Sequence, residues 1–489
     1  MNTPRPTARS GGVVGILALA GIVAAITQTL VVPLIAELPE ILGTSSSNAS
    51  WVITATLLAA AVATPVAGRL GDMFGKRRML LASLVPLVAG SVVCALSSSV
   101  VPMIVGRGLQ GFGMGVVPLG ISLLRDVVPA EKLGSSIAVM SASMGVGGAL
   151  GLPFAAAIAE NSSWRVLFWV VAALSLAIGA LIWFLVPGDA QGRTSQGFDV
   201  LGAIGLGIAL VCLLLGVSKG ADWGWGSGTT LGLLAVSVVV LLVWGRWELR
   251  ITDPLVDLRV TARPQVLLTN AASILIGFAM YAQSLVVPQL FQLPEATGYG
   301  LGQSMLAMGL WMAPSGLMMM IMSPVGAKIS AAKGPKVTLA IGALIISLGY
   351  GLAVPMIDGG STGSLLVVTL VCNTGVGFAY GAMPALIMGA VPQSETASAN
   401  SFNTLMRSIG SSLSAAVIGV VMAQMTTDFG GHALTSAGGF RVAMLIGCGV
   451  ALAAAVIAVL IPVRRPAKAD APVADPTGPT TPEAAANTA

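Results

Sequence analysis

The chain has 489 residues, of which 55% are hydrophobic and only 9% are charged. A soluble domain carries about 25% charged residues, so this composition excludes a soluble globular protein and predicts a polytopic membrane protein. The net charge of +5 does not indicate a nucleic-acid partner, because the basic residues lie in short segments between apolar runs, where they act as topology signals.

Residue types needed for metal and cofactor chemistry are scarce. The cysteines Cys94, Cys212, Cys372 and Cys448 are far apart in apolar runs, and His432 is the only histidine. We therefore expect no metal site, no cofactor and no disulfide framework. The sequence has no phosphate-binding Walker motif that would indicate ATP as the energy source. No span offers a nucleophile with a histidine or carboxylate partner, so an enzyme is not expected.

Apolar runs of bilayer length follow a short polar stretch, residues 1–11. The first run, 12–38, is too long for the apolar core of a cleavable signal, so we expect a retained helix. The segment 463–489 is rich in Pro, Ala and Thr and is expected to be a disordered cytoplasmic tail. Hydropathy predicts about fourteen transmembrane helices, at about 12–38, 51–70, 79–98, 101–124, 136–159, 165–186, 199–219, 229–247, 265–290, 303–327, 336–356, 364–389, 401–425 and 441–462.

The positions of Lys and Arg agree with an even number of helices. With fourteen spans, twenty of the 24 basic residues fall on one side, Arg69, Lys76 and Arg407 among them, and three fall on the other. The positive-inside rule makes the first side cytoplasmic, so both termini of a multi-pass protein of the cell membrane are expected there. Arg107 lies inside a span.

The densest run of charge is GRLGDMFGKRR, residues 68–78, between two apolar runs. Its basic residues are expected to lie in water or headgroups, and its glycines permit a tight turn. A degraded copy, GAKISAAKGPK, occupies residues 326–336. The copy comes eight spans later rather than six, so the simplest arrangement is 6+2+6: a six-helix bundle at 12–186, two inserted helices at 199–247 and a second bundle at 265–462.

The first of these stretches resembles the loop signature of the major facilitator superfamily, and fourteen spans resemble its drug:proton antiporter branch. Four further stretches carry the same resemblance over nearly the whole chain: RGLQGFGMG (107–115), GVGGALGLP (145–153), WRVLFW (164–169) and SFNTLMRSIG (401–410). The resemblance implies an all-α major facilitator fold and a secondary transporter that works by alternating access, with proton-coupled efflux of hydrophobic drugs or other organic compounds. An uptake permease of the same fold and an exporter of an endogenous lipid or secondary metabolite remain alternatives.

The resemblance also implies a conformational latch in the signature stretch, in which an ion pair between Asp72 and Arg125 holds the cytoplasmic side closed. The candidate latch residues are Gly68, Asp72, Gly75, Arg77 and Arg125.

Proton coupling requires a carboxylate that protonation switches between two contacts. Antiporters of the branch usually carry an aspartate in the first helix, but this chain has Thr27 and Gln28 at that point. The remaining candidates for coupling are Glu37, Arg107 and Glu160, with Glu37 preferred because it lies at about the depth of Arg107, whose proximity would lower its pKa against the effect of burial. Arg107 has an alternative structural role, binding backbone carbonyls of neighbouring helices.

Other polar residues within the spans could line a substrate cavity or join helices. A small hydrophobic organic substrate is expected, and a strongly cationic one is not, because no carboxylate lies in the middle of a span. The candidate cavity residues are Gln28, Gln110, Tyr281, Gln283, Gln289, Asn373 and Tyr380.

Overall fold

The computed structural model describes residues 7–31, 34, 38–188, 197–357, 359–429 and 432–462, and these residues are nearly all helical. Fourteen of the described helices are long and apolar enough to cross a bilayer, which confirms the predicted number. Apolar segments of this length form helices because hydrocarbon offers no partner for backbone N–H and C=O groups, which a helix pairs internally. The expected tail, 463–489, lies outside the described residues.

The first six spans run from α1 to α9. The predicted fourth span is one membrane crossing with a break, since α6 ends at Phe112 and a single 3-10 turn, Gly113–Gly115, precedes α7. The bounds are α1 Thr7–Thr29, α2 Leu38–Ile41, α3 Ser46–Ala49, α4 Trp51–Phe74, α5 Lys76–Leu96, α6 Val100–Phe112, α7 Val116–Val127, α8 Ala130–Asn161 and α9 Arg165–Leu185.

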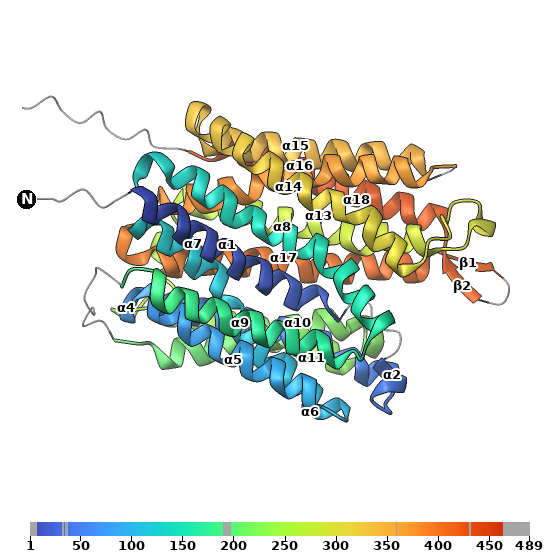
Figure 1. The fold of residues 1–489 in the computed structure, drawn as a ribbon, viewed down its shortest axis with the longest axis horizontal. Coiled ribbons are helices and arrows are strands. Elements are labelled where there is room, and N and C mark those ends of the chain that lie inside the picture. Colours follow the sequence, from blue (N-terminus) through green and yellow to red (C-terminus); the bar gives the residue numbers. More distant parts are fainter. Residues whose placement is uncertain are drawn as a thin grey trace, which may run out of the picture.

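The remaining spans run from α10 to α18. An antiparallel hairpin that the sequence did not predict follows α17 and extends beyond the helices at one end of the molecule (Figure 1). The bounds are α10 Val200–Trp223, α11 Gly228–Glu248, α12 Leu258–Thr261, α13 Pro264–Gln292, α14 Met305–Lys333, α15 Pro335–Met356, α16 Thr362–Met388, α17 Thr396–Gln424, β1 Thr426–Phe429, β2 His432–Thr435 and α18 Ala437–Leu460.

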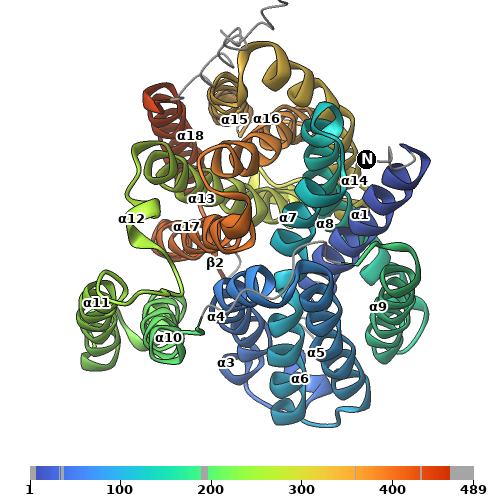
Figure 2. The same cartoon turned by 90° about the vertical axis from the view of Figure 1, so that its left-hand side faces the viewer.

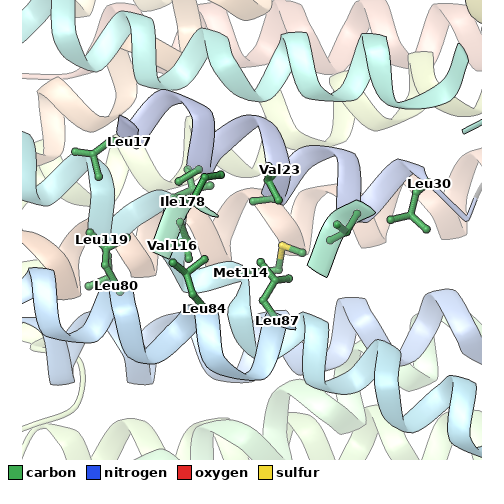
Figure 3. Packing of buried hydrophobic residues seen from close by; sticks show 14 of the residues in the cluster. Leu17, Val23, Leu30, Leu80, Leu84, Leu87, Met114, Val116, Leu119 and Ile178 are labelled. Atoms are coloured by element: carbon green, nitrogen blue, oxygen red, sulfur yellow. The ribbon is translucent and has the colours of Figure 1, made fainter. Parts of the chain in front are cut away.

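Buried side chains form two large hydrophobic clusters. The first joins α1 and α4 to α9, where Leu17, Leu87 and Val116 are among the buried residues (Figure 3). The second joins α13 to α18. Viewed end-on, α10 and α11 stand beside these two groups of helices (Figure 2). A smaller cluster that includes Leu206 of α10 and Phe402 of α17 fixes the inserted pair against α4 and α17.

The two groups of helices approach each other closely along α8 and α14. A Cβ added to Gly316 of α14 would lie 3.2 Å from the carbonyl carbon of Gly145 in α8, and one added to Gly309 would lie 3.2 Å from the nitrogen of Pro153. Small residues allow this approach, which gains van der Waals contact where lipid supplies no hydrophobic driving force between helices. The glycine-rich stretch 145–153 is therefore a helix-packing surface.

Two glycines with positive φ form the matching turns of the internal repeat. Gly75 (φ 103°) separates α4 from α5, and Gly334 (φ 90°) separates α14 from α15. A residue with a side chain would be strained in this conformation, which is why both copies keep a glycine between their helices.

Candidate functional site

At the end of α4, the carboxylate of Asp72 caps a helix of the other group. Its Oδ1 accepts a hydrogen bond from the N–H of Ala397 (3.1 Å), and its Oδ2 accepts from the N–H (2.8 Å) and the hydroxyl (2.6 Å) of Ser398. Both N–H groups lie in the first turn of α17, where they have no intrahelical partner and where the helix dipole is positive. The carboxylate of Asp72 accepts hydrogen bonds from both N–H groups, and its negative charge is stabilised by the helix dipole. Asp72 therefore ties the two groups of helices together.

A buried ammonium makes a second connection at the same end. Lys76 Nζ lies 2.7 Å from Oδ2 of Asp126 and donates to the Thr396 hydroxyl at 2.9 Å. The other oxygen of Asp126 accepts from the amide of Gln393 at 3.0 Å. We call Asp72, Lys76, Asp126, Thr396 and Ser398 the polar latch, because each of these side chains bonds across the boundary between α1–α9 and α13–α18.

Two expectations for this region are wrong. Arg125 forms no salt bridge in the described part of the chain and donates instead to the Val391 carbonyl at 3.3 Å. The N-terminus of α17, instead of Arg125, is the partner of Asp72, because this helix terminus presents several donors in fixed positions. Arg69 and Lys76 do not lie in water, since their side chains are only 6% and 3% exposed. They belong to α4 and α5 rather than to a loop, because helix continues to Phe74 and begins again at Lys76.

Glycine allows α4 and α17 to meet. A Cβ on Gly68 would lie 2.6 Å from the Cβ of Ser401 and 2.7 Å from the Ala397 carbonyl oxygen, so a larger residue would force the helices apart. Arg77 contacts the first group of helices: it donates to the Trp183 carbonyl, and its guanidinium carbon lies 5.9 Å from the centroid of the Trp183 ring.

Arg107 is buried inside the first group of helices. Its Nη1 donates to the Thr27 carbonyl (2.8 Å) and to Oε1 of Gln110 (2.7 Å), and its Nε donates to the Val52 carbonyl (3.2 Å). Thr27 lies in the last turn of α1, whose carbonyls lack intrahelical donors. Arg107 therefore joins α1, α4 and α6, as its structural alternative requires, while Gln110 also donates to Ser91 at 2.8 Å.

A second arginine, counted above among the cytoplasmic basic residues, lies within a span. Arg407 is 7% exposed and belongs to α17, which begins at Thr396 rather than near residue 401. Its guanidinium carbon lies 4.4 Å from the ring centroid of Tyr380. The signal that would have placed it correctly is its position inside the predicted span 401–425.

The predicted cavity residues do not form one cluster. Tyr380 lines a small cavity between the two groups of helices, together with Ser141, Asn400 and Arg407. The others are spread over the chain: Gln28 is exposed on α1, Gln110 is buried beside Arg107, Tyr281, Gln283 and Gln289 lie along α13, and Asn373 donates to the Thr369 carbonyl within α16.

The acidic candidates for coupling lie partly outside the described residues. Glu37 is not among them, and α1 ends at Thr29, so the described helix does not reach Glu37. Glu160 belongs to α8, but its side chain lies outside the described residues. The third candidate, Arg107, donates hydrogen bonds to two backbone carbonyls and to the side chain of Gln110.

Replacing Asp72 by Asn should loosen the polar latch. The amide is neutral and offers the end of α17 one acceptor oxygen, so we expect closure to weaken by about 1–3 kcal/mol. Residue 401 is buried against Gly68, so a Ser401→Cys side chain reports opening of this end. This cysteine should be alkylated about tenfold faster when Asp72→Asn is added than when Asp72 is kept. The exposed Glu131 provides the control Glu131→Gln, and equal alkylation rates in the two variants would contradict the role of Asp72.

Replacing Arg107 by Leu should destabilise the first group of helices. The change leaves the Thr27 and Val52 carbonyls without this donor, at about 1–3 kcal/mol for each unpaired group. The thermal unfolding midpoint in detergent should fall clearly, whereas Arg246→Gln, at an exposed position of α11, should change stability by at most about 0.5 kcal/mol. An unchanged midpoint for Arg107→Leu would show that the contacts of Arg107 do not hold α1, α4 and α6 together.

Three curated proteins are similar to this chain over most of its length. An uncharacterized MFS-type transporter of Mycobacterium tuberculosis is 30% identical over 424 residues, 85% of this chain and 60% of that protein. The tetracenomycin C resistance and export protein of Streptomyces glaucescens is 28% identical, covering 83% of this chain and 74% of that protein. Multidrug resistance protein 3 of Bacillus subtilis is 26% identical, covering 85% and 80%. The chain thus spans only about 60% of the length of the mycobacterial relative.

Among solved structures, the human organic anion transporter MFSD10 matches with a TM-score of 0.65, covering 93% of this chain and 100% of that one. At 15% identity, this match shows a shared fold. The family model of the Major Facilitator Superfamily matches residues 17–415. With the predicted fold present and the family model covering most of its length, the chain belongs to the Major Facilitator Superfamily.

Proposed function

We propose that this transporter exports hydrophobic organic compounds across the cell membrane by alternating access, driven by the proton gradient. The observation that carries the proposal is the polar latch, which closes one end of the molecule by contacts between two groups of helices. Alternating access needs a closure that holds in one state and breaks in the other. The names of two relatives, a resistance and export protein and a multidrug resistance protein, support export.

The latch end is assigned to the cytoplasm under this proposal. It carries Arg69, Lys76, Arg77 and Arg78, and the positive-inside rule favours the cytoplasm for such a face. Both termini would then be cytoplasmic, and the structure would be closed toward the cytoplasm. Removing Arg407 from the cytoplasmic set leaves the charge asymmetry in place.

Two rigid bodies would perform the movement, residues 12–186 and 265–462, with residues 199–247 as an inserted pair. The two large hydrophobic clusters fall within these two ranges almost entirely, which supports separate movement. The latch would break whenever the cytoplasmic end opens. Asp72→Asn weakens the latch and biases the molecule toward the state that is open to the cytoplasm, so the return to the closed state, and with it the transport cycle, would be slower.

Transport in membrane vesicles of defined orientation tests the function. Inverted vesicles that contain the full chain should accumulate hydrophobic dyes when a proton gradient is imposed, without ATP, and a protonophore should abolish the accumulation. Accumulation only in right-side-out vesicles would show an uptake permease. If no dye moves and cells lacking the protein retain one of their own lipids or secondary metabolites, the exporter has an endogenous substrate instead.

Replacing Glu37 by Gln tests the proposed coupling. If Glu37 carries the proton, the neutral amide should abolish gradient-driven accumulation but spare substrate exchange at equilibrium, since exchange moves no net proton. Both rates are measured in the same vesicles, with Glu131→Gln as the control. Normal accumulation by Glu37→Gln would exclude Glu37 and favour either Glu160 as the proton carrier or an uncoupled mechanism.

A further inference from the structure

Arg407 is a described intramembrane arginine whose guanidinium has neither a salt bridge nor a hydrogen bond among the described residues. At 1.5 Å per residue it lies about 16 Å along α17 from Thr396, which is about half of a hydrocarbon core of ~30 Å. It forms no salt bridge with any described carboxylate. Its recorded partner is the face of Tyr380, 4.4 Å from the guanidinium carbon. Arg107, by contrast, donates to three acceptors.

The cavity beside Arg407 lies on the boundary between the two groups of helices. Ser141 of α8 borders it from one side, and Tyr380, Asn400 and Arg407 border it from the other. The Ser141 hydroxyl donates across this boundary to the Tyr380 carbonyl at 3.0 Å. The cavity measures about 10 Å³, room for a single water molecule, so a larger ligand would reach Arg407 only when the two groups separate.

A second polar group in this cavity lacks a partner. Asn400 is 3% exposed, and its Nδ2 donates to the Ser122 hydroxyl at 3.2 Å, but its Oδ1 has no hydrogen-bond partner in the described residues. A buried acceptor without a donor is unfavourable, so a state that supplies a donor is favoured over this one. Arg407 and Asn400 therefore need complementary partners, an anion and a hydrogen-bond donor.

The charge around the cavity is of one sign. Arg407 is the only charged residue among those that line it, and the remainder are neutral. The larger cavity near the latch end differs, because it mixes Arg69 with the carboxylates Asp253, Asp257 and Glu395. A cationic group at the central cavity would meet like charge in a medium of low dielectric constant, whereas an anion would form charge-assisted hydrogen bonds with the guanidinium.

We propose that Arg407, with Tyr380 and Asn400, forms the subsite for the acidic group of an amphipathic organic anion, a carboxylate or sulfonate; a neighbouring hydrogen-bond donor, where the substrate has one, would satisfy Asn400 Oδ1. The inference rests on the proposed function, since it names the substrate class of the exporter. When the two groups of helices part, the guanidinium binds the anion in a bidentate fork, Asn400 Oδ1 accepts from any neighbouring donor, and the apolar body of the substrate contacts the surrounding side chains.

Asn400 connects this subsite to closure of the molecule. It donates to Ser122, and the Ser122 hydroxyl in turn donates at 3.0 Å to the carbonyl of Thr396, a member of the polar latch. A ligand that draws the Asn400 side chain toward Arg407 would therefore act on the same helix end that Asp72 caps.

The experiment compares three pyrene probes of different charge in the inverted-vesicle assay: pyrenebutyrate, the neutral pyrenebutanol and the cationic pyrenemethylamine. The wild-type chain should transport pyrenebutyrate with the lowest KM. Arg407→Gln should raise that KM by about tenfold or more and change the KM for pyrenebutanol by less than about twofold, because the neutral alcohol offers the guanidinium no charge to pair. Arg407→Lys should restore part of the affinity for pyrenebutyrate, and Arg246→Gln should leave all three probes unchanged.

Each outcome either supports the anion subsite or refutes it. An equal loss for all three probes would make Arg407 a structural residue and overturn the inference, as would an unchanged KM for pyrenebutyrate. If the wild type transports pyrenebutanol but not pyrenebutyrate, the anion subsite is refuted and the exporter stands. If it transports none of the probes, the proposed function fails and the inference with it. Should Arg407→Gln not fold, Arg407→Lys is measured alone, and a raised KM for pyrenebutyrate only is the expected result.

Discussion

The fold depends on one constraint: a polar group inside the bilayer must find its partner within the protein, because hydrocarbon provides none. Arg107 shows how this requirement is met. Its guanidinium binds carbonyls on α1 and α4 and the amide of Gln110, and Gln110 passes the chain of hydrogen bonds on to Ser91 of α5. Arg107 and Gln110 thereby join four helices at a point where α1 ends and its last carbonyls need donors.

Under the same constraint, the boundary between the two groups of helices has an apolar part and a polar part. Along α8 and α14 it is apolar and close, built on Gly145, Gly309 and Gly316. At the latch end it is polar, and the helix end at Ala397 and Ser398 receives the carboxylate of Asp72. Apolar contacts between small residues tolerate sliding, whereas hydrogen bonds are made or broken. A polar closure beside an apolar contact surface is a suitable arrangement for two discrete states.

Much of this architecture could be predicted from the sequence. The composition required a membrane protein, hydropathy located fourteen spans, and the separation of GRLGDMFGKRR from its copy by eight spans indicated an inserted pair. The membrane-protein class and the number of spans are confirmed, because burial of backbone in lipid depends on the length and apolarity of each segment alone. The two turn glycines, Gly75 and Gly334, were visible for the same reason, since the need for positive φ is local.

Partners across the boundary were decided by the tertiary structure. The sequence indicated that Asp72 would act at the cytoplasmic end, but it could not show that the carboxylate caps α17 rather than pairing with Arg125. It counted Arg407 with the cytoplasmic basic residues, near the start of the span predicted at 401–425, although only the true start of α17 sets the depth of that arginine in the membrane. Local patterns determine which segments cross the bilayer and which way the chain turns. The identity of a polar partner hundreds of residues away depends on how the helices assemble, and no spacing in the sequence encodes that.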